Sequence, residues 1–192
     1  MRRIGALCAA VGLVVLAAAT PTGAQEGDAA VARPAPEPGS ARFEGRQIDL
    51  RAGWGAARAC MVWNEAAVVE CFRTPEEMSA REEALAARGG RRTGDSVTAS
   101  STWSCSSPLR LYEHGYYGGR QLSFWDAGFW QNLGDWGFND AVSSYRVGSC
   151  HAWMAEHSWG GGEWYPGNTS PWVNSPTMWS GWNDRISSIY NA

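Results

Sequence analysis

Residues 137–144 read Gly-Phe-Asn-Asp-Ala-Val-Ser-Ser, and residues 181–188 read Gly-Trp-Asn-Asp-Arg-Ile-Ser-Ser. The two stretches differ at three positions, and two of these differences, Phe for Trp and Val for Ile, keep the chemistry. Upstream, residues 112–119 and 154–161 also match, because each reads as a large apolar residue, four residues, an aromatic residue, any residue and glycine. The region 109–192 is therefore predicted to hold two copies of one supersecondary unit.

The repeated phrase offers only hard oxygen donors. Asp, Asn and Ser side chains carry neither thiolate nor imidazole, and turns add free backbone carbonyls. Calcium takes about six to eight oxygen ligands, which is more than one phrase supplies but within reach of two phrases that share their oxygens. The alternative interpretation is that Asn-Asp before Val/Ile-Ser-Ser is only a turn that enters a strand, since both residues favour turns.

Residues 109–192 resemble the βγ-crystallin family, whose Greek-key motif reads aromatic-x4-aromatic-x-Gly with a Ser late in the motif. Calcium-binding members carry Asn/Asp-Asn/Asp-x-x-Ser/Thr-Ser in each motif, and both phrases of this chain fit that pattern. The resemblance implies an all-β sandwich of two Greek-key motifs in which each motif lends a strand to the other's sheet. It also implies two calcium sites.

The resemblance further assigns roles to individual residues. Asp140 and Asp184 would be side-chain ligands, and Ser143 and Ser187 would each lend a hydroxyl to the site that the other motif completes. Backbone carbonyls would fill the remaining positions, from Ala141, Arg185 and the loops near His114 and Glu156. The full set of implied metal-binding residues is Asn139, Asp140, Ala141, Ser143, Asn183, Asp184, Arg185 and Ser187.

Other residues of the two motifs are implied to be structural. Ser144 and Ser188 would each hydrogen-bond the folded-over first hairpin of their own motif. Arg185 would give its carbonyl to a site, and its charge would weaken that site slightly. The full set of implied structural residues is Tyr112, Tyr117, Gly119, Ser144, Trp159, Gly161 and Ser188.

The N-terminus carries a basic start, an apolar run over 4–19 and small residues up to Ala24, which is typical of a secretory signal peptide. We therefore expect residues 1–24 to be removed and the protein to be secreted and extracellular, with no membrane span in the mature chain. All of its basic residues are arginines, which together with the abundant Ala and Gly indicates a bacterial gene. Loss of two of the 16 arginines and none of the 19 acids leaves a net charge of −5, which argues against a nucleic-acid partner.

The remaining chain is predicted to fall into four parts. Residues 25–57, rich in Ala, Pro, Gly and Arg, are interpreted as a disordered linker. Residues 58–90 are predicted to form a small, separate accessory module, a disulfide-stapled hairpin followed by a helix that begins at Pro75. Residues 91–102 are a second linker, and 103–192 form the crystallin-like domain. Its expected strands are 109–112, 121–125, 143–147, 151–155, 163–165 and 187–190.

Four cysteines remain after export, an even number that predicts two disulfides in an oxidising compartment. Three pairings are open. We favour Cys60 with Cys71 and Cys105 with Cys150, because each pair then stays within one part of the chain.

Some of the aromatic residues are predicted to lie in the core and others to lie at the surface. Trp136, Phe138, Trp179 and Trp182 are assigned to the core, whereas the Pro-rich loop 164–179 is the candidate partner-binding surface. The three histidines lie in no recognised catalytic motif, so that we expect no enzyme. Two alternative functions stay open beside calcium binding: inhibition of an extracellular protease, as in the crystallin-like secreted metalloproteinase inhibitors, and binding of a cell-wall or other polysaccharide.

Overall fold

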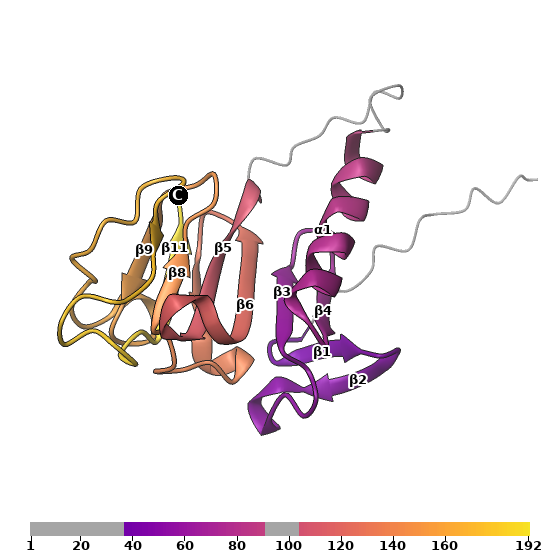
Figure 1. Cartoon of the computed structure of the whole chain (residues 1–192), viewed down its shortest axis with the longest axis horizontal. Coiled ribbons are helices and arrows are strands. Elements are labelled where there is room, and N and C mark those ends of the chain that lie inside the picture. The colour runs from indigo at the N-terminus through magenta and orange to yellow at the C-terminus, as the bar shows by residue number, and fades with distance from the viewer. Residues whose placement is uncertain (1–36, 91–103) are drawn as a thin grey trace, which may run out of the picture. The chain divides into compact units, whose positions relative to one another are not determined.

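The computed structural model describes residues 37–90 and 104–192. The predicted signal peptide, the linker over 91–102 and the first part of the linker over 25–57 lie outside these residues. The described residues form mostly short strands, with single turns of 3-10 helix (η) and one α-helix between them. Figure 1 labels the α-helix and most of the strands. Among the described residues, no helix is long and apolar enough to cross a membrane.

The C-terminal part is built from two motifs that exchange strands. The strands of the first motif are β5 (Ser104–His114), β6 (Gly118–Asp126), β7 (Trp130–Asn132) and β8 (Ser144–Arg146). Those of the second motif are β9 (Ala152–Ala155), β10 (Asn174–Ser175) and β11 (Ser188–Asn191), and Trp164 adds an isolated bridge to Ala155. Strand β7 pairs with β11 of the second motif, and β10 pairs with β8 of the first. This confirms the predicted sandwich in which each motif lends one strand to the other's sheet.

Single turns of 3-10 helix shape the corners between these strands. They are η2 (Gly115–Tyr117) and η4 (Ser158–Gly160) in the two hairpins, and η3 (Leu133–Trp136) ahead of the first repeated phrase. Each hairpin turn contains a residue with a left-handed backbone, φ 56° at Tyr116 and φ 58° at Trp159. The chain is thereby folded back over its own strands in both motifs.

The N-terminal part adds four strands and a helix. They are β1 (Ser40–Phe43), β2 (Arg46–Asp49), β3 (Ala59–Trp63), β4 (Val68–Phe72) and α1 (Pro75–Gly90), with η1 (Leu50–Ala52) between β2 and β3. The hairpin of β3 and β4, its Cys60–Cys71 bridge and the helix agree with the prediction. Figure 1 shows α1 running alongside β3 and β4. Met78 and Leu85 of this helix belong to the same hydrophobic cluster as Met61 of β3 and Val68 of β4.

The predicted separation of this part from the crystallin-like part is wrong. Strand β3 pairs in parallel with β6, so that one sheet runs in the order β10-β8-β5-β6-β3-β4-β1-β2. Without β3, the backbone groups along one edge of β6 would have no strand partner, and an open edge of this kind is usually covered in native proteins. Residues 59–62 therefore continue the first Greek-key sheet beyond β6, and β4, β1 and β2 follow in the same sheet.

The interpretation of residues 37–57 as disordered is also wrong. Leu50 and Ala57 are fully buried and Trp54 is 3% exposed, all in the same hydrophobic cluster as the core of both Greek-key motifs. The indole Nε1 of Trp54 donates a hydrogen bond of 2.8 Å to the carbonyl of Trp136. A few large side chains therefore order a segment whose average composition resembles that of a linker.

The core of the C-terminal part contains most of the aromatic residues expected there. Trp136, Phe138 and Trp182 are buried, as predicted. Trp179 is 57% exposed, so that its assignment to the core is wrong. It lies in the long loop between β10 and β11, outside any strand.

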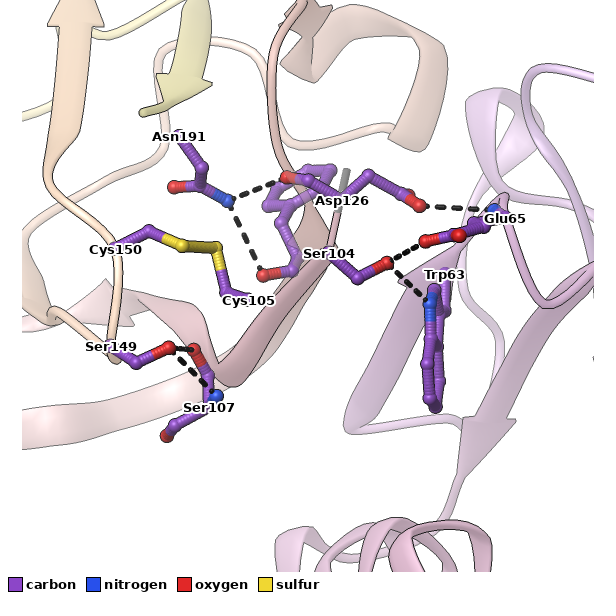
Figure 2. Close-up of a disulfide and its surroundings, with 10 residues drawn as sticks. Trp63, Glu65, Ser104, Cys105, Ser107, Asp126, Ser149, Cys150 and Asn191 are labelled. Carbon is purple, nitrogen blue, oxygen red and sulfur yellow. Dashed lines mark hydrogen bonds between the residues drawn. A yellow bond between two sulfur atoms is a disulfide. The ribbon is translucent and has the colours of Figure 1, made fainter. Parts of the chain in front are cut away.

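The predicted bridge between Cys105 and Cys150 joins the start of β5 to the end of the first motif (Figure 2). Beside it, the carboxylate of Asp126 accepts hydrogen bonds from the backbone N–H groups of Asn64 (2.8 Å) and Glu65 (3.0 Å) in the turn between β3 and β4. Asn191 of β11 donates to the backbone carbonyl of Asp126 at 2.9 Å. Asp126 thus connects the N-terminal hairpin to the Greek-key sheets.

The burial of Asp126 predicts a pH dependence of stability. Desolvation raises the pKa of this carboxyl group, against the opposing effect of the hydrogen bonds from Glu65 and Asn64. A raised pKa means that the folded state binds the proton more tightly than the unfolded state, where the pKa is about 3.9. The contribution of Asp126 to stability is therefore fully present below the pKa that this group has in the unfolded state. It is lost as the pH rises through the pKa that the group has in the folded state.

Urea denaturation of the wild type and Asp126→Asn at pH 7 and pH 4 measures this contribution. The asparagine variant cannot titrate at this position. We expect the wild type to gain in unfolding free energy relative to the variant as the pH falls. A wild type that instead loses stability relative to Asp126→Asn over this interval would show that the pKa is lowered.

Candidate metal centre

The two repeated phrases form two corners of the same shape. Each opens on a glycine with a left-handed backbone, and Asp140 and Asp184 are themselves left-handed, with φ 50° and 54°. Among residues with a side chain, Asp and Asn tolerate this conformation best. The corners also bond each other, because the N–H of Asp140 donates to the carbonyl of Ile186 (3.0 Å) and that of Asp184 to the carbonyl of Val142 (3.1 Å).

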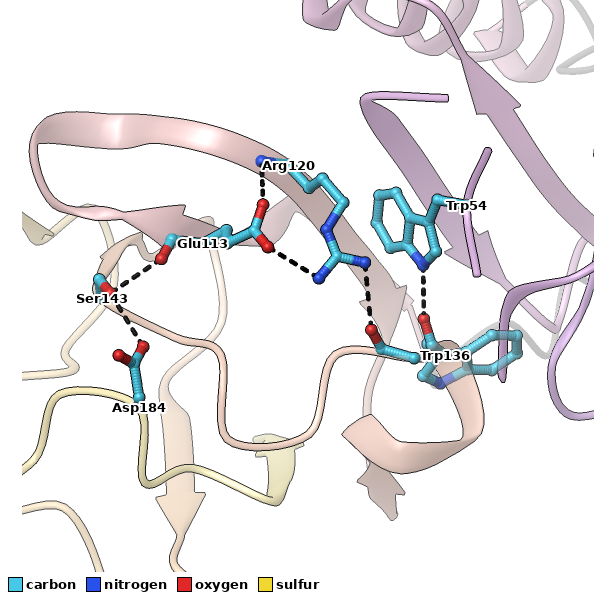
Figure 3. Close-up of polar contacts among 7 residues, drawn as sticks. Trp54, Glu113, Arg120, Trp136, Ser143 and Asp184 are labelled. Carbon is cyan, nitrogen blue, oxygen red and sulfur yellow. Dashed lines mark hydrogen bonds and ion pairs between the residues drawn. The ribbon is translucent and has the colours of Figure 1, made fainter. Parts of the chain in front are cut away.

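The side chains cross from one corner to the other. The hydroxyl of Ser143 lies 3.0 Å from Oδ1 of Asp184, and the hydroxyl of Ser187 lies 2.9 Å from Oδ1 of Asp140. Ser143 also donates to the carbonyl of Glu113 at 2.8 Å, so that three oxygens converge at this corner (Figure 3). The structure thus brings each aspartate to the serine of the other phrase.

The asparagines hold the carboxylates in place. Nδ2 of Asn139 donates to Oδ2 of Asp140 at 2.8 Å, and Nδ2 of Asn183 donates to Oδ2 of Asp184 at 2.7 Å. Each carboxylate therefore turns its other oxygen toward the serine of the opposite phrase. Asn139 and Asn183 orient ligand candidates through their side-chain amides.

The oxygen donors fit a hard cation. Around a calcium ion with ligands at about 2.3–2.6 Å, neighbouring oxygens lie about 3 Å apart, which is the spacing of the Asp and Ser oxygens in both corners. The carbonyl oxygens of Ala141 and Arg185 accept no hydrogen bond within the described residues and so remain open for a ligand. Within residues 37–90 and 104–192, no three His, Cys, Asp or Glu side chains cluster, so that any metal site here depends on hydroxyl and carbonyl oxygens.

The positive charge of Arg185 is paired with two carboxylates. Its guanidinium lies 2.8 Å from Glu156 and 3.2 Å from Glu163, and it stacks on the ring of Trp182 at 4.7 Å. The hydrogen bond from Arg185 lowers the pKa of Glu156. The charge that was expected to weaken the site is thus shared with acidic groups of the neighbouring hairpin.

The first corner has a similar pair that sequence reasoning missed. Arg120 bonds Glu113 through its backbone N–H (3.1 Å) and its guanidinium (2.9 Å), and this interaction lowers the pKa of Glu113. The same guanidinium donates to the carbonyl of Gly137 at 3.2 Å and lies 4.9 Å from the ring of Trp54 (Figure 3). A chain of contacts therefore runs from the N-terminal part to the carbonyl of Glu113 beside Ser143.

The last serine of each phrase pins a hairpin. Ser144 donates to the carbonyl of His114 (2.7 Å) and accepts from the N–H of Tyr117 (3.0 Å). Ser188 donates to the carbonyl of His157 (2.6 Å) and accepts from the N–H of Gly160 (3.0 Å). Both contacts have the form that the resemblance implied for these serines.

These contacts correct the alignment of the two hairpins by one residue. Because Ser188 bonds Gly160 where Ser144 bonds Tyr117, the counterpart of Tyr117 is Gly160, and the structural roles expected of Trp159 and Gly161 are wrong. Trp159 corresponds to Tyr116, and the two side chains are 68% and 79% exposed. The glycine equivalent to Gly119 is Gly162, with φ 73° against 75°.

A tryptophan from the first motif explains the difference between the hairpins. In the first hairpin, the rings of Tyr112 and Tyr117 pack edge to face with centroids 5.4 Å apart. In the second, a Cβ atom on Gly160 would lie 2.4 Å from the ring of Trp130. The ring of Trp130 thus occupies the space beside Gly160, and nothing in the local sequence of the second hairpin reveals this.

No protein-family model and no curated protein matches this chain. Solved structures do match. A beta gamma crystallin from Ciona intestinalis is 27% identical, with 45% of this chain and 100% of that chain covered and a TM-score of 0.38. A double mutant of a βγ-crystallin domain from Clostridium beijerinckii is 24% identical, with 45% and 97% covered and a TM-score of 0.38. A clostrillin double mutant in complex with nickel is 21% identical, with 45% and 98% covered and a TM-score of 0.38.

The strand pairing and the corners of this chain define its fold. The two motifs exchange β7 and β10, each motif folds its first hairpin back over its own strands, and a serine at the start of its last strand pins that hairpin. Residues 104–192 therefore form a βγ-crystallin-type sandwich of two Greek-key motifs, extended at one edge by strands from residues 40–72.

Proposed function

We propose that the protein is a secreted calcium-binding protein in which two clamps bind calcium and stabilise the fold. The observation that supports this most strongly is the reciprocal placement of Asp140 with Ser187 and of Asp184 with Ser143. Two disulfides in the structure support an extracellular location, because such bonds persist in oxidising compartments.

In this proposal, each clamp draws on both phrases. Asp184 and Ser143 bind one ion together with the carbonyl of Glu113, and Asp140 and Ser187 bind the other. Backbone carbonyls of the two corners complete the oxygen shell, and Asn139 and Asn183 orient the carboxylates. An ion bound in this way connects the two motifs at points where only hydrogen bonds otherwise join them.

We expect calcium to raise the thermal stability of the purified protein. A ligand present at 100 times its dissociation constant stabilises the folded state by about 2.7 kcal/mol per site. Melting curves in calcium and in EGTA measure this difference. Asp184→Ala should lose the part of the calcium-dependent stabilisation that one site contributes. The matched control is Glu83→Gln, which removes one exposed carboxylate of α1 and should respond to calcium as the wild type does. A wild-type melting temperature that calcium leaves unchanged contradicts the proposal.

A further inference from the structure

A row of aromatic side chains covers the outer face of the smaller sheet. Trp130 on β7, Tyr190 on β11 and Trp153 on β9 lie directly opposite one another across the three strands. Their sequence neighbours Ile189 and Met154 point into the core, which places the row on the opposite face. Trp153 is 41% exposed, so that the row is accessible from outside.

Trp164 completes the row and is fixed in position. Its ring lies 5.6 Å from that of Trp130 and 5.3 Å from that of Trp153, and its indole N–H donates to the carbonyl of Gly160 at 2.8 Å. The ring nevertheless stays 50% exposed. A large exposed ring held in one orientation binds a ligand with little loss of conformational freedom.

A cavity adjoins this row at Trp130. It has a volume of about 280 Å³, and Phe129 and Trp159 contribute exposed rings to its wall (43% and 68% exposed). Polar residues also line it, among them Asn132 and Asp135. Neither Arg nor Lys is among the described residues that line the cavity, so that its chemistry favours a ligand without phosphate or carboxylate groups.

The amide of Gln131 does not reach this cavity. The residue is 5% exposed, and it pairs across the ladder with Ile189, which points into the core. The amide of the next residue is available instead. Asn132 accepts a hydrogen bond from the N–H of Trp159 through Oδ1 (2.8 Å), which leaves its NH₂ group as a donor for a ligand.

We propose that this face binds a neutral polysaccharide. A pyranose ring has an apolar C–H face that packs on an aromatic ring and a rim of hydroxyl groups that need donors and acceptors. The exposed rings of Trp159 and Trp164 supply the stacking surfaces, and the side chains of Asn132 and Asp135 supply the hydrogen-bonding groups. This site is separate from the calcium clamps and shares no residue with them.

The site differs from the loop 164–179 that the sequence suggested as a partner surface. Of that loop, only Trp164 takes part. Trp172 and Trp179 are 65% and 57% exposed, but neither lines the cavity beside Trp130 and neither contacts a ring of the row. Both therefore lie outside the proposed site.

Retention on insoluble cellulose, chitin and starch tests the proposal, followed by titration of soluble oligosaccharides from whichever polymer retains the protein. We expect Trp159→Ala to weaken binding at least about tenfold, the loss expected when one stacked ring is removed. Trp172→Ala is the matched control, since it also removes an exposed ring (65% exposed) and should bind as the wild type does. Thermal melts verify that both variants are folded.

Three results would overturn the proposal: no retention on any of the three polymers, equal retention of Trp159→Ala and the wild type, or self-association of the protein that Trp159→Ala abolishes. The last result would assign the face to a second copy of the chain. Repeating the assay with Asp184→Ala separates this proposal from calcium binding, because that variant should lose a calcium site and keep polysaccharide binding. Loss of retention in Asp184→Ala with the fold intact would contradict the independence of the two sites.

Discussion

Trp54→Ala is expected to lower the free energy of unfolding by about 3–5 kcal/mol, the range for removal of a buried tryptophan. The side chain is 3% exposed and packs against Phe138 with ring centroids 5.6 Å apart. It also bonds the carbonyl of Trp136 and lies beneath the guanidinium of Arg120. Urea denaturation followed by circular dichroism measures the loss.

The control for this variant is Trp172→Ala. Trp172 is 65% exposed, and its replacement should change the unfolding free energy by no more than about 0.5 kcal/mol. If Trp54→Ala proved as mild as Trp172→Ala, residues 37–57 would not belong to the core. The prediction that these residues form a disordered linker would then be supported.

Removal of the bridge between Cys105 and Cys150 is the second large effect that we expect. The two cysteines are 45 residues apart, and closing a loop of this length stabilises a protein by about 4 kcal/mol in the chain-entropy model. Cys105→Ala/Cys150→Ala should therefore unfold at much lower urea concentration than the wild type.

The other disulfide provides a comparison. Cys60 and Cys71 are 11 residues apart, for which the same model gives about 3 kcal/mol. The double alanine variant of that pair tests whether loop length decides the effect. An unfolding free energy that stays unchanged when Cys105 and Cys150 are replaced would contradict the account of this bridge.

The sequence predicts correctly the features that depend on short sequence patterns, above all on those that occur twice in the chain. The phrase at 137–144 and its copy at 181–188 carry the turn residues, the strand start and the hairpin-pinning serine together. Their repetition predicts two copies of one unit, and the resemblance to the βγ-crystallin family, which the repeated phrases support, implies the exchange of strands and the proximity of the two corners. The sequence left three cysteine pairings open, and the one favoured because each pair stays within one part of the chain is the pairing found in the structure.

The features that the sequence does not predict depend on contacts between distant segments. The parallel pairing of β3 with β6 joins residues about 60 positions apart, and neither strand carries a local signal for its partner. The order of residues 37–57 depends on the contact of Trp54 with the first motif. The register of the second hairpin depends on Trp130, a residue of the other motif that fills the space beside Gly160.

The same limit applies to the candidate metal centre. The sequence identifies the aspartates and serines, because these lie in the repeated phrases. It does not identify the ion pairs of Glu113 with Arg120 and of Glu156 with Arg185, although Glu-His occurs in both hairpins at 113–114 and 156–157. Only the corrected alignment of the hairpins shows these two dipeptides to be equivalent.

Calorimetric titration of calcium into the chelator-stripped protein tests the central claim most directly. The shared clamps predict two calcium ions per chain for the wild type, one for Asp140→Ala or Asp184→Ala, and none when both are replaced. Wild-type protein that binds no calcium, or single variants that still bind two ions, would contradict the proposal that each aspartate completes a site with the serine of the other phrase.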